Sequence, residues 1–370
     1  MKICIVTNST NPGAGLGRVV VSLAKKFFEK QHHVGIVSSE NRSVTNTDFL
    51  NLSLDLNVAR IIRSVEALYR LRQFLRQYDV VLAFDVRPVG IFVHLACIGI
   101  RKPIFIQTLG TYSLFEPGFK LKNLLMSWVY RASFRIFIIN TFVKKSIENS
   151  KPGFKFGKNL ATIPVGVDTK LFHTVNSPTY TYGRPYILSV GAIKERKGQL
   201  RSIQAFSKVS EKFPDLHYVV VGDHNELDPY FVEIKHLIEA ENITHRVHFV
   251  QKISDDDLMD LYSGAEFFIL LPVSTKEFIE GFGMVYLEAA LCGATSIGTY
   301  DTGAEAAIKH GVTGLLVNDT IPEITSAMEL LLTDKKTRDL YRHHAKVNAL
   351  SYDWSYIADM YEQEFLHITQ

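Results

Sequence analysis

The 370-residue sequence has little cysteine and no long apolar run. Its cysteines, Cys4, Cys97 and Cys292, stand among apolar neighbours, which is typical of small buried hydrophobes in a reducing compartment and not of disulfide pairs. The longest apolar stretch, Val89 to Ile100, has 12 residues and falls short of the roughly 20 needed to cross a bilayer. The amino terminus also lacks the apolar core and cleavage site of a signal peptide. We therefore expect a cytoplasmic protein without a membrane span.

Metal-binding and nucleic-acid-binding patterns are missing as well. The 13 histidines contain no His-Glu-x-x-His spacing. Asp255-Asp256-Asp257 has a spacing that could hold a divalent cation, but Ser254, three residues before Asp257, is typical of a helix N-cap. The sequence has no zinc-finger or RNA-binding signature, which argues against a nucleic-acid partner. We expect no metal and no cofactor.

The net charge of +3 hides an asymmetry between the two halves of the chain. Residues 1–167 hold 23 Lys and Arg against 9 Asp and Glu, whereas residues 168–370 hold 18 against 29. A basic first half indicates contact with something anionic, and an anionic membrane surface is one candidate. Mutual attraction of the two halves is the alternative explanation.

Short β-branched runs alternate with amphipathic stretches, which predicts parallel sheets built from strand-helix-strand units. The pattern occurs twice, and a linker rich in turn-forming residues separates the two copies near residues 164–185. We predict an α/β protein with two doubly wound, Rossmann-like domains facing across a cleft. The predicted strands are Lys2 to Thr7, Val34 to Ser38, Val80 to Phe84, Ile104 to Thr108, Ile136 to Ile139, Tyr186 to Val190, Tyr218 to Val221, Val247 to Val250, Phe267 to Leu271, Thr295 to Gly298 and Gly314 to Val317.

Ligands of such sheets bind beside the carboxyl ends of the strands, so the loops there are the candidate sites. The first is the glycine-rich loop that contains Gly15 and Gly17 and ends at Arg18. Its glycines would let backbone amides approach a phosphate or sugar. It does not match a dinucleotide fingerprint, because that motif needs a small residue where Arg18 stands. A turn without a ligand is the alternative.

The second candidate loop runs from Glu280 through Gly281, Phe282 and Gly283 into a helix. A helix N-terminus with free amides suits a diphosphate, but its dipole is worth only about 0.3 to 2 kcal/mol, so a cation is needed too. Within the helix, Val285 and Glu288 are three residues apart and share a face. Glu288 can therefore accept hydroxyl protons from a ribose.

Arg196 and Lys197 could supply the missing positive charge. They follow the first strand of the second half, and their charge-assisted hydrogen bonds to a leaving diphosphate would be worth about 1.5 to 3 kcal/mol each. A solvated charged turn is the alternative for these residues taken alone.

Together these motifs resemble the retaining glycosyltransferases of the GT-B fold, specifically the large family 4, also called glycosyl transferases group 1. The resemblance covers almost the whole chain. It rests on the motifs Gly15 to Arg18, Ile163-Pro164-Val165-Gly166-Val167-Asp168 with Phe172, Arg196-Lys197-Gly198, and the pair Glu280 and Glu288.

The resemblance implies an acceptor-binding domain at residues 1–167, a nucleotide-sugar-binding domain at 168–350 and a helix at 351–370 that returns to the first domain. It implies a metal-independent hexosyltransferase that uses a UDP- or GDP-linked sugar and a glycan or lipid-linked acceptor, in cell-surface polysaccharide or lipopolysaccharide biosynthesis. The implied catalytic residues are Glu280, Lys197 and Arg196. The implied donor-binding residues are Gly15, Gly17, Arg196, Lys197, Phe282, Gly283, Met284, Val285 and Glu288, and the acceptor side holds Arg18, Gly110 and Thr111.

Two positions depart from the family pattern. Ala192 stands where the family commonly has an arginine, and Leu109 stands where members often carry a histidine that contacts the donor. A nucleotide-sugar-binding protein without transfer activity is therefore an alternative hypothesis, and a nucleotide-sugar epimerase of similar architecture is another.

A basic stretch with apolar and aromatic residues, from Phe119 to Arg131, bears on the acceptor. If Leu124, Leu125 and Trp128 are exposed, this surface could lie on anionic lipid at the inner face of the cell membrane. If they face the sheet of their own domain, only the lysines are exposed.

Overall fold

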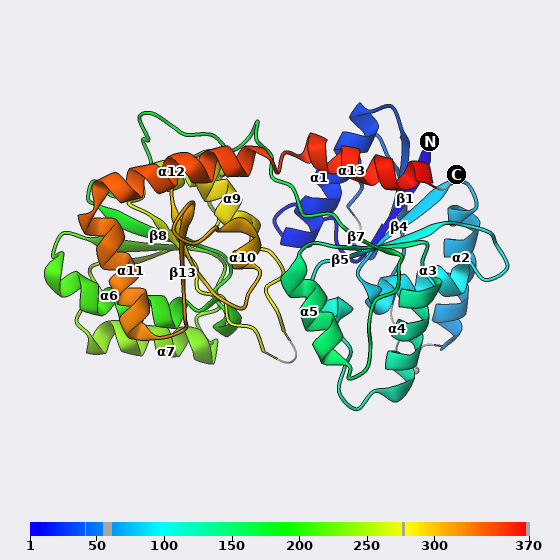
Figure 1. The fold of residues 1–370 in the computed structure, drawn as a ribbon, viewed down its shortest axis with the longest axis horizontal. Helices are drawn as coiled ribbons and strands as arrows, with labels where there is room; N and C mark the ends of the chain where they lie inside the picture. The colour runs from blue at the N-terminus through cyan, green and yellow to red at the C-terminus, as the bar shows by residue number, and fades with distance from the viewer. Residues whose placement is uncertain (41, 55–60, 276–277, 368–370) are drawn as a thin grey trace. The chain divides into compact units, whose positions relative to one another are not determined.

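The computed structural model describes residues 1–40, 42–54, 61–275 and 278–367, and in it the predicted strand-helix alternation is present twice (Figure 1). The chain divides into two units. The first unit comprises Met1–Gly166 and Trp354–Gln370, and the second comprises Val167–Asp353. Among the described residues, no helix combines the length and the apolar character that a membrane span requires.

The described part of the first unit contains a parallel seven-stranded sheet. Its strands are β1 (Lys2–Thr7), β2 (His33–Ser38), β3 (Asp48–Asn51), β4 (Val80–Phe84), β5 (Ile104–Thr108), β6 (Arg135–Ile138) and β7 (Leu160–Thr162). Its helices are α1 (Gly15–Glu29), α2 (Ile61–Leu75), α3 (Ile91–Ala96), α4 (Lys120–Ala132), α5 (Thr141–Ser150) and α13 (Trp354–Leu366), with short turns η2 (Val86–Gly90) and η3 (Thr111–Ser113).

The second unit is built in the same way on a parallel six-stranded sheet, counted over its described residues. Its strands are β8 (Tyr186–Val190), β9 (His217–Val221), β10 (Val247–Val250), β11 (Phe268–Ile269), β12 (Ser296–Thr299) and β13 (Gly314–Val317). Its helices are α6 (Gln199–Lys212), α7 (Pro229–Ala240), α8 (Asp255–Gly264), α9 (Met284–Leu291), α10 (Ala304–Ala307), α11 (Ile321–Thr333) and α12 (Lys335–Leu350), with the short turn η4 (Glu195–Lys197).

Both sheets reverse their strand order at one point. The first has the order β3-β2-β1-β4-β5-β6-β7 and the second β10-β9-β8-β11-β12-β13. The chain therefore winds outward in both directions from β1 and β4 in one unit, and from β8 and β11 in the other. Ligands of doubly wound sheets bind at this reversal, beside the carboxyl ends of the strands. The predicted pair of doubly wound sheets is confirmed.

Central parallel strands are buried on both faces, which is why they are readable as continuous apolar runs. The predicted bounds of β1, β4, β5, β8, β10 and β13 are confirmed. The edge strands β3 and β7 carry no such run because they are short and partly exposed. The strand predicted at Phe267 to Leu271 is shorter, at Phe268–Ile269.

The C-terminal helix α13 packs on α1 through an aromatic cluster within the first unit (Figure 1). The ring of Phe27 lies 6.2 Å from that of Tyr361 and 5.9 Å from that of Phe365, measured between centroids. Phe365 in turn meets Phe105 of β5 at 4.7 Å. These rings join the end of the chain to the sheet that its beginning forms.

We expect Phe27→Ala to lower the free energy of unfolding by about 3 to 5 kcal/mol, because Phe27 is fully buried and its loss leaves a cavity beneath α13. The matched control is Phe28→Ala, since this neighbour is 44% exposed and should cost much less. Urea unfolding monitored by circular dichroism measures both. Equal destabilisation by the two variants would contradict the proposed anchoring of α13.

Candidate active site in the second unit

The turn after β8 is fixed against the segment that follows β11. Gly198 has φ 71°, and a Cβ atom built on it would lie 1.9 Å from the carbonyl oxygen of Leu271. The amide of Val273 donates to the carbonyl of Arg196 at 2.9 Å. A side chain at position 198 would separate these two segments, so the glycine is what lets the basic turn sit at the point where the strand order reverses.

Glu280 brings the predicted cations together. Its Oε2 lies 2.5 Å from Nη1 of Arg196, and its Oε1 lies 2.7 Å from Nζ of Lys197. Each carboxylate oxygen therefore holds one of two cations that stand 83 and 84 residues away in the chain. The solvated charged turn, considered as the alternative for these cations, does not describe this arrangement.

The charge state of Glu280 follows from two opposing effects. Burial alone would raise the pKa of its carboxyl, but the Lys197 ammonium and the Arg196 guanidinium outweigh burial and hold the pKa below its ordinary value. Glu280 is therefore an ionised carboxylate at neutral pH. Side chains of Lys197 and Glu280 keep only 14% and 11% of their surface exposed, so their attraction is weakly screened by salt.

The loop between Glu280 and α9 is tightly packed. Gly283 precedes the helix with φ 78°, a conformation that L side chains rarely adopt. A Cβ atom on Gly303 would lie 2.3 Å from the carbonyl carbon of Gly281, and the Gly303 amide donates to the carbonyl of Glu280 at 2.9 Å. Phe282 is buried and meets the ring of Tyr352 at 5.7 Å. The first amides of α9 are thereby held in place behind Glu280.

The remaining predicted residues of α9 lie in its first turns. Met284 and Val285 are partly buried. Glu288 is 4% exposed, and its Oε2 accepts a 3.4 Å hydrogen bond from the hydroxyl of Tyr262 on α8. No sequence pattern pointed to Tyr262, because it belongs to another helix and shows only the spacing of a core residue.

A hollow of about 750 Å³ opens beside Arg196. Basic and acidic side chains share its wall with two aromatic rings. The lining includes Lys194, Glu195, Arg201, Tyr230, Glu233 and Phe278. Space for a polar ligand therefore exists next to the ion pair of Arg196 and Glu280.

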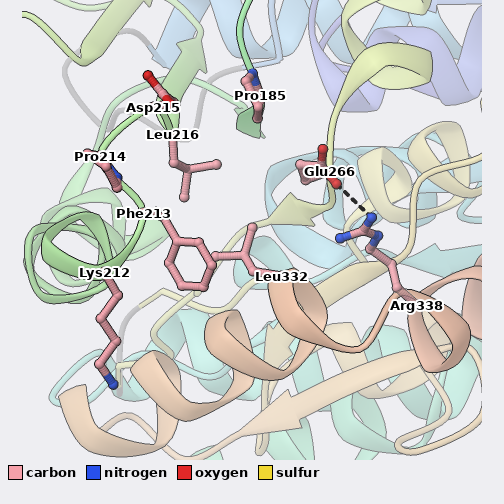
Figure 2. A pocket seen from close by; sticks show the side chains of 9 residues that line it. All are labelled: Pro185, Lys212, Phe213, Pro214, Asp215, Leu216, Glu266, Leu332 and Arg338. Atoms are coloured by element: carbon pink, nitrogen blue, oxygen red, sulfur yellow. Dashed lines mark ion pairs between the residues drawn. The ribbon is translucent and has the colours of Figure 1, made fainter.

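A second hollow of the same unit, of about 330 Å³, lies near the amino ends of β8 and β9 (Figure 2). Phe213, Leu216 and Leu332 line its apolar side. On its polar side Arg338 of α12 pairs with Glu266 at 2.9 Å, the interaction marked in Figure 2. None of the predicted site residues lines this hollow, which stands at the opposite edge of the sheet from Glu280.

The glycine-rich loop of the first unit has a clear packing role. A Cβ atom on Gly17 would lie 2.0 Å from the carbonyl oxygen of Asn11, so the loop closes on the first turn of α1 only with glycine there. Gly15 is the exposed first residue of α1. Arg18 donates from Nε to the carbonyl of Pro12 at 3.3 Å. These contacts account for the loop's shape.

The two positions that depart from the family pattern are also ordered. The carbonyl of Ala192 accepts a 3.2 Å hydrogen bond from Gln199. The amide of Leu109 donates to Asp85 at 3.0 Å, and Gly110 and Thr111 follow it at the start of η3.

Carboxylates, cysteines and histidines do not gather into a metal site in the described ranges, where no group of three or more could hold an ion. The predicted N-cap is confirmed, because the Ser254 hydroxyl accepts from the amide of Asp257 at 3.1 Å.

Comparison with known families shows which family this part of the chain matches. The family described as glycosyl transferases group 1 matches residues 178–347, a region that includes the Arg196 turn, Glu280 and α9. This match covers 170 of the chain's 370 residues.

Two curated relatives of this protein differ in how much of the chain they match. A GDP-mannose-dependent alpha-(1-6)-phosphatidylinositol monomannoside mannosyltransferase from Mycolicibacterium smegmatis is 29% identical over 209 residues, which is 53% of this chain and 53% of the relative. The match thus spans about half the length of that relative. An N-acetyl-alpha-D-glucosaminyl L-malate synthase from Bacillus anthracis is 24% identical over 365 residues, covering 92% of this chain and 90% of the relative.

Solved structures of similar fold match nearly the whole chain. A glycosyltransferase from Rickettsia africae matches with a TM-score of 0.84 and 17% identity, covering 100% of this chain and 98% of that one. The Anabaena protein Alr3699/HepE, solved in complex with UDP and glucose, matches with a TM-score of 0.82 and 17% identity over 99% of both chains. With the sheet topology described above, these likenesses establish the GT-B fold.

Two glycines with the same φ allow the cost of backbone strain to be measured apart from the cost of close packing. Gly198 and Gly311 both have φ 71°, but Gly311 has open space where a Cβ atom would stand. We expect Gly311→Ala to cost about 1 kcal/mol of unfolding free energy, and Gly198→Ala to cost at least about 2 kcal/mol more because its Cβ meets Leu271. Thermal unfolding of both variants measures the difference, and equal costs would refute the packing role of Gly198.

Proposed function

We propose that this protein is a retaining glycosyltransferase that moves a sugar from a UDP- or GDP-linked donor to a glycan or lipid-linked acceptor of a cell-surface polysaccharide or lipopolysaccharide. The supporting observation is the buried Glu280 carboxylate, which holds Arg196 and Lys197 at the strand-order reversal of the second sheet. Relatives of the same family include a GDP-mannose-dependent enzyme, and one fold neighbour was solved with UDP and glucose. We therefore propose either UDP or GDP as the nucleotide that carries the donor sugar.

The roles of the site residues follow from charge and position. In the proposed complex, Lys197 and Arg196 face the donor diphosphate, which also takes hydrogen bonds from the first amides of α9, near Gly283, Met284 and Val285. Glu280 accepts hydrogen bonds from hydroxyl groups of the transferred sugar, and Glu288 accepts them from the ribose hydroxyls. The donor diphosphate and Glu280 together carry about three negative charges against the two cations, so in this metal-independent proposal the N-terminus of α9 offsets part of the remaining charge.

The first unit binds the acceptor in this proposal. Gly110, Thr111 and Arg18 border the acceptor, and the glycine loop at Gly15 and Gly17 closes on the donor phosphates. During transfer, the bond between the sugar C1 and the β-phosphate oxygen breaks, and a bond from C1 to the acceptor oxygen forms on the same face of the ring. The acceptor proton passes to a β-phosphate oxygen. The protein's share is positioning and charge stabilisation.

Calorimetric titration with UDP, GDP and ADP tests the donor site. We expect one nucleotide to bind selectively and Lys197→Ala to weaken it about 10- to 100-fold, because a charge-assisted hydrogen bond to phosphate is lost. The same variant should weaken the binding of inorganic diphosphate by a similar factor. Glu288→Ala should weaken only the nucleoside diphosphate, since Glu288 is assigned to the ribose.

The control is Lys208→Ala, an exposed lysine of α6 paired with Glu241, which should bind as the wild type does. Binding of none of the nucleotides would refute a nucleotide-sugar donor. Anomeric configuration of the product, followed by NMR, then tests retention: a product of inverted configuration contradicts the mechanism, and nucleotide binding without any turnover favours the non-catalytic alternative.

We also propose a peripheral membrane location for this enzyme, which an exposed apolar and basic surface on α4 supports. Near the N-terminus of α4, Phe119, Leu121 and Leu124 are 53%, 72% and 65% exposed, whereas Met126 and Val129 are buried. Lys120 is exposed beside them, and the Lys122 ammonium lies 4.5 Å from the centre of the Phe119 ring. Leu125 and Trp128 are partly buried. Apolar side chains flanked by lysines, on the half of the chain with the positive charge, suit an anionic lipid surface.

Co-sedimentation with phosphatidylglycerol vesicles tests this location. We expect the triple variant Phe119→Ser, Leu121→Ser, Leu124→Ser to lower vesicle binding at least about 10-fold, because each apolar side chain contributes on the order of 1.5 kcal/mol when buried in lipid. The matched control replaces three exposed apolar residues of the second unit, Leu227, Leu340 and Val347, by serine. Wild-type binding that does not depend on anionic lipid would contradict the proposal.

A further inference from the structure

A buried carboxylate stands at the strand-order reversal of the first unit. Asp85 is the first residue after β4, and β4 pairs with β1 where the order of the sheet reverses. Ligands of doubly wound sheets bind at this place. Asp85 is only 5% exposed. It therefore lies beneath a ligand-binding position and out of direct reach of a ligand.

The side chain of Asp85 is committed to one loop. Its Oδ1 accepts hydrogen bonds from the amide of Leu109 at 3.0 Å and from the hydroxyl of Ser113 at 2.7 Å. The amide of Gly110 hydrogen-bonds to the same carboxyl. Every one of these donors belongs to the five residues from Leu109 to Ser113. The carboxylate therefore fixes the backbone of the loop that contains Gly110 and Thr111.

Two further contacts hold the same loop. Nη2 of Arg87 donates to the carbonyl of Thr111 at 3.2 Å, and Arg87 is ion-paired with Glu116. The hydroxyl of Tyr130 on α4 donates to the carbonyl of Ser113 at 2.6 Å. The loop is thus tied to the end of β4, to η2 and to α4.

This arrangement is costly, which separates it from ordinary loop packing. Asp85 has φ 65° and ψ 160°, a backbone conformation that residues other than glycine rarely adopt. Burial also raises the pKa of its carboxyl, despite the hydrogen bonds that it accepts. Buried carboxyl groups and strained backbones occur together at functional sites more often than elsewhere.

We propose that Asp85 is a positioning residue for the acceptor. By fixing the amides of Leu109 and Gly110 and the hydroxyl of Ser113, it sets the place of Gly110 and Thr111 and, through them, of the acceptor hydroxyl that attacks the sugar. The inference rests on the proposed function, which assigns the acceptor to this loop. Asp85 itself does not touch the substrate.

The test compares three activities of Asp85→Ala in the full chain. These are nucleotide binding by calorimetry, hydrolysis of the donor by water, and transfer to the acceptor. We expect transfer to fall about 10- to 100-fold because a displaced acceptor reacts poorly. Nucleotide binding and donor hydrolysis should stay within about 2-fold, since the proposed donor residues lie in the second unit and in the loop of Gly15 and Gly17, outside the segment from Leu109 to Ser113 that Asp85 fixes. A purely structural role would lower all three together.

Two milder variants keep the test decisive if Asp85→Ala does not fold. Asp85→Asn keeps an oxygen acceptor for the loop and should restore part of the transfer rate. Ser113→Ala removes one of the hydrogen bonds and should lower transfer alone, by a smaller factor. The matched control is Asp48→Ala, a carboxylate of the same unit that pairs with His33 and Tyr78 at the amino end of β3. It should leave transfer within about 2-fold.

The outcomes distinguish this inference from the proposed function. If Asp85→Ala and Ser113→Ala both transfer at the wild-type rate, the positioning role is wrong. The proposed function still stands in that case. Equal loss of nucleotide binding, hydrolysis and transfer also overturns it. A wild-type protein that binds a nucleotide-sugar but transfers to no acceptor contradicts the proposed function, and the positioning role with it.

Discussion

The ion pairs of Glu280 with Arg196 and Lys197 are the constraint on which the second unit's site depends. They join the turn after β8 to the loop before α9, two segments that the chain separates by more than 80 residues. Gly198 and Gly303 make the approach possible because a side chain at either position would collide with a neighbouring backbone. A carboxylate paired with two cations stays ionised. The cluster as a whole is positively charged, so it can bind a negatively charged ligand.

The two units share a doubly wound topology, but the pKa values of their carboxyl groups are shifted in opposite directions. Each has a carboxylate with little exposure where the strand order reverses, the buried Asp85 in the first and the largely buried Glu280 in the second. Cations hold the pKa of Glu280 below its ordinary value, whereas burial raises that of Asp85, whose partners are amides and a hydroxyl. A carboxylate beside two cations suits a diphosphate donor. In the proposed reaction, the loop that Asp85 fixes places an uncharged acceptor hydroxyl.

The sequence predicts best what depends on local pattern. Strands buried on both faces, such as β1 and β8, are continuous apolar runs, and the Ser254 cap needs only a residue three positions away. The edge strands β3 and β7 were not predicted, because their short and partly exposed segments show no such run. Arg196, Lys197 and the loop of Glu280 were predicted to serve one diphosphate, but their ion pairs with each other were not predicted, because these contacts depend on how β8 and β11 pair. Asp85 and Tyr262 carry no motif, and only the fold gives them their partners.

The most direct test of this account is a crystal structure of the protein with the nucleoside diphosphate that it binds. The account predicts the diphosphate within hydrogen-bonding distance of the Lys197 ammonium and the first amides of α9, with the ribose beside Glu288. A nucleotide bound in the hollow of Figure 2, or one that leaves Lys197 without a phosphate contact, would contradict it.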